Sequence, residues 1–325
     1  CGNGTKLAED GYFSMFISDG VSAEICFIVF ALITLTIIFA GVRNGIERVS
    51  KFMMPILVVL SVIIAIYSVT RPGALKGIQY FLVPNLENFS WMTVVSAMGQ
   101  MFYSLSIAMG ILVTFGSYMK KEVSIEESTE NVELFDTAIA IMAGLMIIPA
   151  VFSFSGGDPD TLQAGPALMF ITIPKVFASM GLGTVVGVLF FLLVLFAAVT
   201  SSIALTESAV STFEDEVHWN RKRSTVVIGI IMLVLGTLSS LGYGPLDAVK
   251  ILGMQFLDFF DFLTNSVMMP IAAIATCLLV SRVIGVDRIE EEMTQEGGTF
   301  RRKKIFVMMI KYLCPVFAAI ILISS

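Results

Sequence analysis

The sequence predicts an all-α membrane protein, a polytopic helical bundle with about eight membrane spans. Three features support this fold class: a strongly apolar composition, apolar segments of helix length, and basic residues that fall in alternate connectors. Hydrophobic residues make up 56% of the 325 residues and charged residues only 14%, with a mean hydropathy of +0.89. A soluble domain carries roughly a quarter charged residues, so this chain suits a lipid solvent better than water.

The apolar segments are long enough to cross a bilayer, which takes about 20 residues of α-helix. Turn-rich or charged connectors separate them. In chain order the predicted spans are Ile25–Val42, Phe52–Val69, Trp91–Tyr118, Leu134–Phe154, Val185–Ser211, Ser224–Leu241, Phe256–Val280 and Ile305–Ser325.

The connectors predict an orientation. Most of the 20 Lys and Arg residues fall in every second connector, and basic loops face the cytoplasm. Both ends of the chain are then expected outside. The outer connector between Phe154 and Gly183 holds an apolar run, ALMFITIPKVFASM, that is too short to cross. We expect this run to form a re-entrant or lid-like outer segment.

The composition also argues against several functions. No basic patch indicates nucleic-acid binding. The one histidine, His218, lies in a charged connector, so a histidine-based metal site or nucleophile is not expected. The four cysteines, Cys1, Cys26, Cys277 and Cys314, show no CxxC spacing and are expected to be small buried thiols rather than redox or metal groups.

Polar residues inside apolar spans are the best functional candidates, because lipid does not solvate them. The middle of Trp91–Tyr118 holds Gly99, Gln100, Ser104, Ser106 and Gly110. These small and hydroxyl residues can let the helix unwind, which would expose backbone groups to an ion and a carboxylate. They are also typical of a close helix–helix seam, so both interpretations stay open.

Three other spans carry similar candidates. Asp136 can be a functional acid or a cap at the membrane boundary. Thr200 and Ser201 can ligate a small cation, or their hydroxyls can bond to the backbone one turn earlier. Asp258 and Asp261 share a helix face and suit either a gate or a solvated helix start.

Six ordered strings resemble those of the neurotransmitter:sodium symporter family, in its bacterial amino-acid-transporter branch. They span nearly the whole chain. The strings are GVRNGIERVSKFMMP, MGQMFYSLSIAMG, DTAIAIMAGLMIIPAVFSF, AGPALMFITIP, LFAAVTSSIALTESAVSTFEDE and FLDFFDFLTNSVMMP.

The resemblance implies a fold whose first ten helices form two inverted five-helix repeats. It identifies residues 1–325 as one transmembrane transporter domain that covers helices four to eleven. The second repeat is then complete, the first is truncated, and helices one to three are absent. The chain begins with Cys1 rather than Met, which fits this expectation of an N-terminally truncated domain.

The resemblance also implies roles for individual residues. A broken helix is expected within Gln100–Gly110. The implied substrate contacts are Tyr103, Ser104, Ser106, Met109, Ser201 and Leu205. The implied sodium ligands are Ser104, Asp136, Ala197, Thr200 and Ser201. Asp261 resembles the outer-gate acid, Asp215 and Tyr118 resemble the inner gate, and Gln100 and Asp136 fall in the chloride region.

The function that follows from the resemblance is sodium-coupled symport of an amino acid, hydrophobic or aromatic, by alternating access across the plasma membrane. The partners are then the amino acid, Na⁺ as a co-transported ion and the lipid bilayer, without an organic cofactor or enzymatic chemistry. Two alternatives remain. One is a non-transporting or regulatory relative, and the other is an intramembrane aspartyl protease that uses Asp136 and Asp261, although no GxGD-type motif accompanies these acids.

Overall fold

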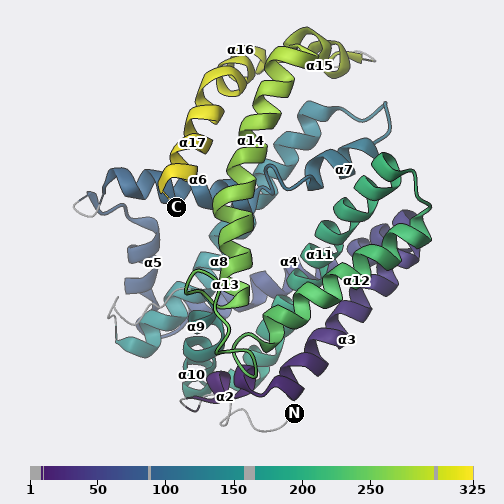
Figure 1. Cartoon of the computed structure of the whole chain (residues 1–325). Helices are drawn as coiled ribbons and strands as arrows, with labels where there is room; N and C mark the ends of the chain where they lie inside the picture. Colours follow the sequence, from purple (N-terminus) through teal and green to yellow (C-terminus); the bar gives the residue numbers. More distant parts are fainter. Residues whose placement is uncertain (1–8, 10, 87–88, 157–164, 296–298, 325) are drawn as a thin grey trace. The chain divides into compact units, whose positions relative to one another are not determined.

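The computed structural model describes residues 9, 11–86, 89–156, 165–295 and 299–324. These residues are helical apart from connectors and an isolated bridge between Ile251 and Met254 (Figure 1). Cys1 and Ser325, which the sequence analysis named, lie outside the described residues. The chain divides into two compact units. Unit 1 comprises residues 1–86 and 138–250, and unit 2 comprises residues 87–137 and 251–325.

Unit 1 holds the helices of the first and middle parts of the chain. They are α2 (Tyr12–Ser18), α3 (Gly20–Phe39), η1 (Val42–Glu47), α4 (Arg48–Val69), α5 (Ala74–Leu82), the second half of α8 (Ile125–Ser155), α9 (Gly165–Ala167), η4 (Leu168–Thr172), α10 (Ile173–Ser179), α11 (Gly183–Val217) and α12 (Arg221–Leu241).

Unit 2 holds a shorter middle stretch and the end of the chain. Its helices are α6 (Trp91–Ser104), α7 (Ile111–Ser117), the first half of α8, α13 (Phe256–Asp261), η5 (Phe262–Met268), α14 (Met269–Leu278), η6 (Leu279–Ile284), α15 (Val286–Met293), α16 (Lys303–Met308), η8 (Met309–Leu313) and α17 (Cys314–Ser324).

Within the described part of the chain, seven helices are long and apolar enough to cross a membrane, and each overlaps one predicted span. They are Gly20–Phe39, Val42–Val69, Ile125–Ser155, Gly183–Val217, Arg221–Leu241, Phe256–Ile284 and Lys303–Ser324. The eighth predicted span, Trp91–Tyr118, is divided between α6 and α7. The predicted fold class is therefore confirmed, with one span interrupted.

Several predicted span boundaries were wrong because hydropathy marks only the lipid-facing part of a helix. The largest difference is at α8, which begins at Ile125 rather than Leu134. The Ser124 hydroxyl accepts a hydrogen bond from the Glu127 backbone N–H at 3.3 Å and so caps the helix. Ser124 and Glu127 form an S-x-x-E pattern that is typical of a helix N-terminus, and hydropathy alone does not show it. The helix therefore extends three turns past its apolar part.

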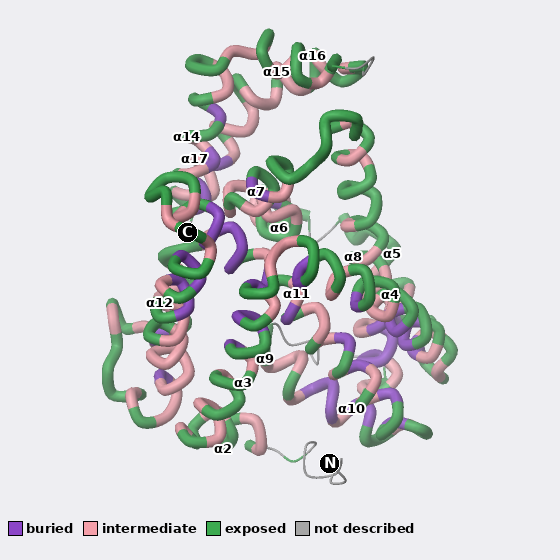
Figure 2. Tube along the Cα trace, turned by 90° about the vertical axis from the view of Figure 1, so that its right-hand side faces the viewer, coloured by how far each residue is buried: buried purple, intermediate pink, exposed green. Residues whose placement is uncertain are grey.

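The core of unit 1 is built from α4, the end of α8, α10 and α11. Ile64, Ala150 and Ile173 are fully buried there, and the rings of Phe177 and Phe190 meet edge to face at 5.4 Å. Figure 2 shows this buried region around α4 and α10. The predicted outer apolar run is a helix over Gly165–Ser179, too short to span. Its packing into the core supports the expectation of a re-entrant or lid-like segment.

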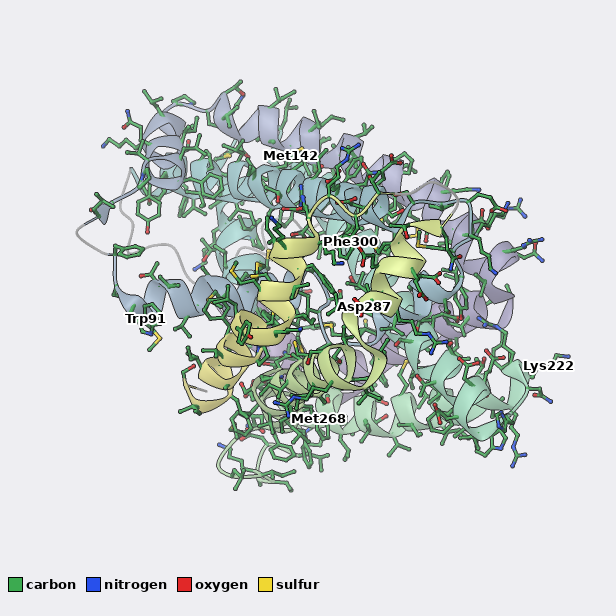
Figure 3. The ribbon with its side chains drawn as sticks, turned by 90° about the horizontal axis from the view of Figure 1, so that it is seen from above. Trp91, Met142, Lys222, Met268, Asp287 and Phe300 are labelled. Carbon is green, nitrogen blue, oxygen red and sulfur yellow. The ribbon has the colours of Figure 1, made fainter. Side chains whose placement is uncertain are left out.

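The core of unit 2 is smaller. Phe102 from α6 packs against Ala273 of α14 and Ala318 of α17, and all three are buried. Ile107 and Ala108, which follow α6, pack against the same cluster. This cluster fixes the end of α6 and the chain just beyond it. In Figure 3, Trp91 marks the start of α6 and Lys222, at the start of unit 1's α12, projects away from its helix.

Gly77 allows α5 to lie against the backbone of α8. A Cβ added at Gly77 would stand 2.8 Å from the Pro149 Cα. We expect Gly77→Ala to destabilise the protein by about 1–3 kcal/mol, because backbone must shift to admit the methyl group. The melting temperature of the purified protein would report the loss.

Gly99→Ala is the matched control, because a Cβ at this position in α6 meets no atom within 4 Å. We expect this change to leave stability the same or to raise it by about 0.5–1 kcal/mol, the usual helix gain of Ala over Gly. Equal melting temperatures for the two variants would contradict the proposed close approach at Gly77.

Candidate functional site

The main irregularity of unit 2 is the gap between α6 and α7. α6 ends at Ser104 and α7 begins at Ile111, so the stretch 105–110 is not helical. Ser106, Ala108 and Gly110 have φ angles of 53°, 64° and 78°. Positive φ is costly for Ser and Ala, and such strain gathers at functional sites. The interruption that the sequence predicted within Gln100–Gly110 is confirmed, and the alternative of a close helix–helix seam stays open.

Ser104 and Asp136 meet beside this gap. The Ser104 hydroxyl donates to Asp136 Oδ1 at 2.6 Å, a short distance typical of a hydrogen bond to a charged acceptor. Asp136 is half-buried and lies well inside α8, far from its N-terminal cap at Ser124. The alternative role of Asp136 as a helix cap is therefore wrong. The structure brings together two of the residues that the sequence predicted as sodium ligands.

The neighbouring predicted site residues lie on the same stretch of chain. Ser106 and Met109 are half-buried within the gap, and Tyr103 is exposed in the last turn of α6. Gln100 lies one turn before Ser104 and is exposed. The last turn of α6 and the gap together present an aromatic ring, a hydroxyl and a thioether within seven residues, while Asp136 comes from α8.

The second predicted sodium group lies in α11 of unit 1. The Thr200 hydroxyl contacts the carbonyl oxygens of Phe196 and Ala197, each at 3.0 Å. The backbone-bonded alternative is thus present. The same contacts place the Thr200 oxygen beside the Ala197 carbonyl, its predicted co-ligand. Ser201 and Leu205 follow on α11, and both are exposed.

The predicted gate residues lie in both units. Asp261 ends α13, and its Oδ1 accepts from Asn265 Nδ2 at 2.5 Å. Asp215 is exposed near the end of α11. Tyr118 follows α7, where its ring meets Phe115 edge to face at 6.1 Å. The roles of these three residues as gates stay predictions.

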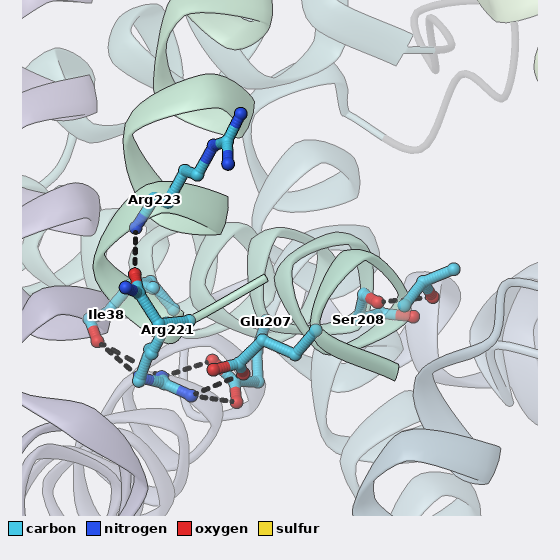
Figure 4. Close-up of polar contacts among 8 residues, drawn as sticks. Ile38, Glu207, Ser208, Arg221 and Arg223 are labelled. Carbon is cyan, nitrogen blue, oxygen red and sulfur yellow. Dashed lines mark hydrogen bonds and ion pairs between the residues drawn. The ribbon is translucent and has the colours of Figure 1, made fainter. Parts of the chain in front are cut away.

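A buried ion pair in unit 1 was missed as an individual site. Glu207 of α11 is fully buried, and Arg221 donates to both of its carboxylate oxygens at 2.9 and 2.6 Å (Figure 4). Arg221 Nε and Nη2 also donate to the Ile38 carbonyl at 3.2 and 3.1 Å. The pair therefore joins α3, α11 and α12. The sequence did contain a signal for this pair. Glu207 is an acid inside an apolar span, and Arg221 lies at the start of the next helix, where it can neutralise that charge.

We expect Glu207→Gln to lower stability strongly, by about 3 kcal/mol, because it removes the fully buried charge of the pair and leaves Arg221 with the longer contact to Glu214, at 3.5 Å. Glu216→Gln is the control, since Glu216 is exposed on the same helix. Melting temperatures of the two variants would show the difference. A loss at Glu216 as large as that at Glu207 would contradict the structural role of the buried pair.

The fold and this site define a class of protein. A bundle of long apolar helices, with one helix interrupted beside hydroxyl and carboxylate oxygens, is the architecture of secondary transporters that couple a substrate to an ion. The profile of the sodium:neurotransmitter symporter family matches residues 15–325. The chain belongs to this family.

Known relatives agree with this assignment. The uncharacterized sodium-dependent transporter YhdH of Bacillus subtilis is 31% identical over 99% of this chain and 71% of its own length. An uncharacterized sodium-dependent transporter of Haemophilus influenzae is 30% identical over 99% of this chain and 69% of its own length. The crystal structure of MhsT in complex with L-phenylalanine superposes with a TM-score of 0.82 at 32% identity, covering 97% of this chain and 70% of MhsT.

Family membership confirms the coarser predictions. The protein is a multi-pass protein of the cell membrane and a sodium-dependent transporter, with Na⁺ as the co-transported ion. It is not an enzyme, so the alternative of an aspartyl protease is wrong. The two acids of that alternative have separate partners, Ser104 for Asp136 and Asn265 for Asp261.

Proposed function

We propose that this transporter couples sodium to the symport of an amino acid with a hydrophobic or aromatic side chain, by alternating access. The observation that carries the proposal is the contact between Ser104 and Asp136 at the edge of the unwound stretch 105–110. A sodium ion needs hard oxygen ligands, and Ser104 and Asp136 of unit 2 offer them. The N–H groups of Leu105, Ser106, Ile107 and Met109 donate to backbone carbonyls, so the substrate carboxylate would bind other backbone groups of this stretch.

Ser104 and Asp136 would hold the first sodium ion. A hydroxyl has one proton and two lone pairs. The Ser104 proton is directed at Asp136, so its oxygen lone pairs stay free for a cation. The Asp136 carboxylate adds the negative charge. A cation can therefore enter without breaking the existing hydrogen bond.

Ala197, Thr200 and Ser201 would hold a second sodium ion. The Thr200 proton is taken up by backbone carbonyls of α11, which again leaves hydroxyl lone pairs free beside the Ala197 carbonyl. Ser201 adds a further exposed hydroxyl on the next residue. The hydrogen bond from the Thr200 hydroxyl to the backbone is compatible with ion binding, because it would orient the hydroxyl oxygen as a ligand.

The substrate would lie against the unwound stretch. Tyr103, Ser106 and Met109 of unit 2 provide an aromatic ring, a hydroxyl and a thioether, while Ser201 and Leu205 of unit 1 stay contacts that the family resemblance implies. These side chains suit an apolar or aromatic substrate. The complex of MhsT with L-phenylalanine, at 32% identity to this chain, supports the same substrate class.

We assign residues 1–325 to one transporter domain in which Asp261 closes the outer gate, and Asp215 and Tyr118 close the inner gate. Coupling follows from linkage, since a ligand that stabilises the closed site raises the affinity of the other ligand by the same factor. The chain covers about 70% of the length of MhsT, so the proposed activity belongs to the whole transporter.

Binding of labelled amino acids at increasing sodium concentration tests the proposal. Ser104→Ala should raise the sodium concentration for half-maximal binding by about tenfold, because one oxygen ligand and its hydrogen bond are lost. Ser128→Ala is the control, since among the described residues the hydroxyl of Ser128 donates to the Ser124 carbonyl of its own helix. Sodium-dependent binding without uptake into vesicles would favour the non-transporting relative instead.

Asp136 also bears on chloride. Gln100 and Asp136 fall in the chloride region that the family resemblance implies, and the fixed carboxylate of Asp136 would replace a bound anion there. Asp136→Asn should therefore make sodium-driven uptake weak and chloride-dependent, as measured in vesicles with chloride or gluconate as the anion. Full, chloride-independent uptake by this variant would show that Asp136 does not supply the charge.

A further inference from the structure

The start of α8 is clamped by the connector that precedes α16. Arg302 Nη1 donates to Glu133 Oε2 at 3.1 Å, and Nη2 lies 3.3 Å from Glu130 Oε1. The backbone N–H groups of Arg301 and Arg302 donate to the two oxygens of Glu126, each at 3.2 Å. All of these residues belong to unit 2. Three acids of one helix thus converge on two consecutive residues.

The spacing of the acids explains the convergence. Positions 126, 130 and 133 are four and three residues apart, so their side chains share one face of α8. The hydrogen bond that Arg302 donates to Glu133, followed by the charges of Glu130 and Glu133, raises the pKa of Arg302. Single exposed ion pairs contribute little to stability, but a network that joins a forked guanidinium and two backbone donors is better ordered.

This clamp is close to Asp136 along the helix. Asp136 follows Glu133 by three residues, a rise of about 4.5 Å. Apolar packing contributes little over this stretch, because Val132, Leu134 and Phe135 are 44%, 66% and 63% exposed. The first three turns of α8 are therefore held in unit 2 mainly by polar contacts, with Arg302 at Glu133 and the Ser104 hydroxyl about one turn further along at Asp136.

We propose that Arg302 is a positioning residue for sodium binding, because it holds α8 at the height and rotation that place Asp136 against Ser104. The inference rests on the proposed role of Asp136 as a sodium ligand. Arg302 touches neither the ion nor the substrate. It acts through Glu130 and Glu133, and the connector 299–302 holds the first turns of α8 in position.

If Arg302 acted on sodium binding only through its positive charge, its removal would change sodium affinity in the opposite direction. A nearby positive charge repels a cation, so its removal would raise sodium affinity. Loss of a positioning contact lowers sodium affinity instead. Exposed charges are screened over about 8 Å at physiological ionic strength, which further weakens the effect of the charge. The direction of the change therefore separates the two explanations.

The experiment compares Arg302→Glu, Glu133→Arg and the double swap in the full-length transporter. Sodium is titrated against choline at constant ionic strength, with binding of labelled phenylalanine as the readout. Each single variant should raise the sodium concentration for half-maximal binding by about fivefold, and the double swap should recover most of that loss. Arg301→Glu is the control, because it makes the same charge change and the described residues include no ion-pair partner for the Arg301 side chain.

Two further measurements separate this inference from the proposed function. Melting temperatures without sodium report whether the Arg302–Glu133 pair forms, and Asp136→Ala reports whether Asp136 binds sodium. Failure of Asp136→Ala to alter the sodium titration would overturn the proposed function and the inference with it. A normal effect of Asp136→Ala, combined with no effect of Arg302→Glu, an equal effect of Arg301→Glu, or no recovery in the double swap, would overturn the inference alone.

Discussion

The constraint on which this structure depends is that lipid offers no hydrogen bonds to the backbone. Each N–H and C=O group within the bilayer needs a partner in the protein, so the chain forms helices wherever it crosses. The stretch 105–110 between α6 and α7 is not helical, yet four of its N–H groups still donate to backbone carbonyls, and the positive φ angles of Ser106 and Ala108 add strain. The packing of Phe102, Ile107 and Ala108 on α14 and α17 stabilises this conformation. The proposed ion and substrate site gives such a stretch a use.

The polar side chains obey the same constraint in two different ways. Glu207 and Arg221 satisfy each other and the Ile38 carbonyl, so this charge pair is closed and serves to join helices. Ser104 and Thr200 each donate their hydroxyl proton, and a hydroxyl that donates still has oxygen lone pairs that can bind a cation. The Asp136 carboxylate accepts this proton from Ser104 and has further lone pairs of its own. The distinction between a closed and an open polar group separates this structural ion pair from the residues proposed to bind ions.

The sequence was sufficient for the fold class and for the approximate place of every long helix, because apolar composition and length decide both. It was weaker wherever a local signal competes with hydropathy. The capping residue Ser124 extends α8 by three turns, and Asp136 accordingly lies inside the helix rather than at its boundary. Contacts between distant segments, such as Arg302 with Glu133, have no periodic pattern in sequence at all. The positions of Tyr103, Ser106 and Met109 in the interruption followed from the family resemblance, not from residue spacing.

The interruption after α6 also bears on how such a protein can diversify. The backbone N–H and C=O groups of residues 105–110 are present whichever side chains these positions carry, except that proline has no N–H. In the proposed site, side chains such as those of Ser106 and Met109 can therefore change with the substrate, while the peptide groups beside them stay the same. A strained turn of main chain thus gives one scaffold a constant part and a variable part within the same six residues.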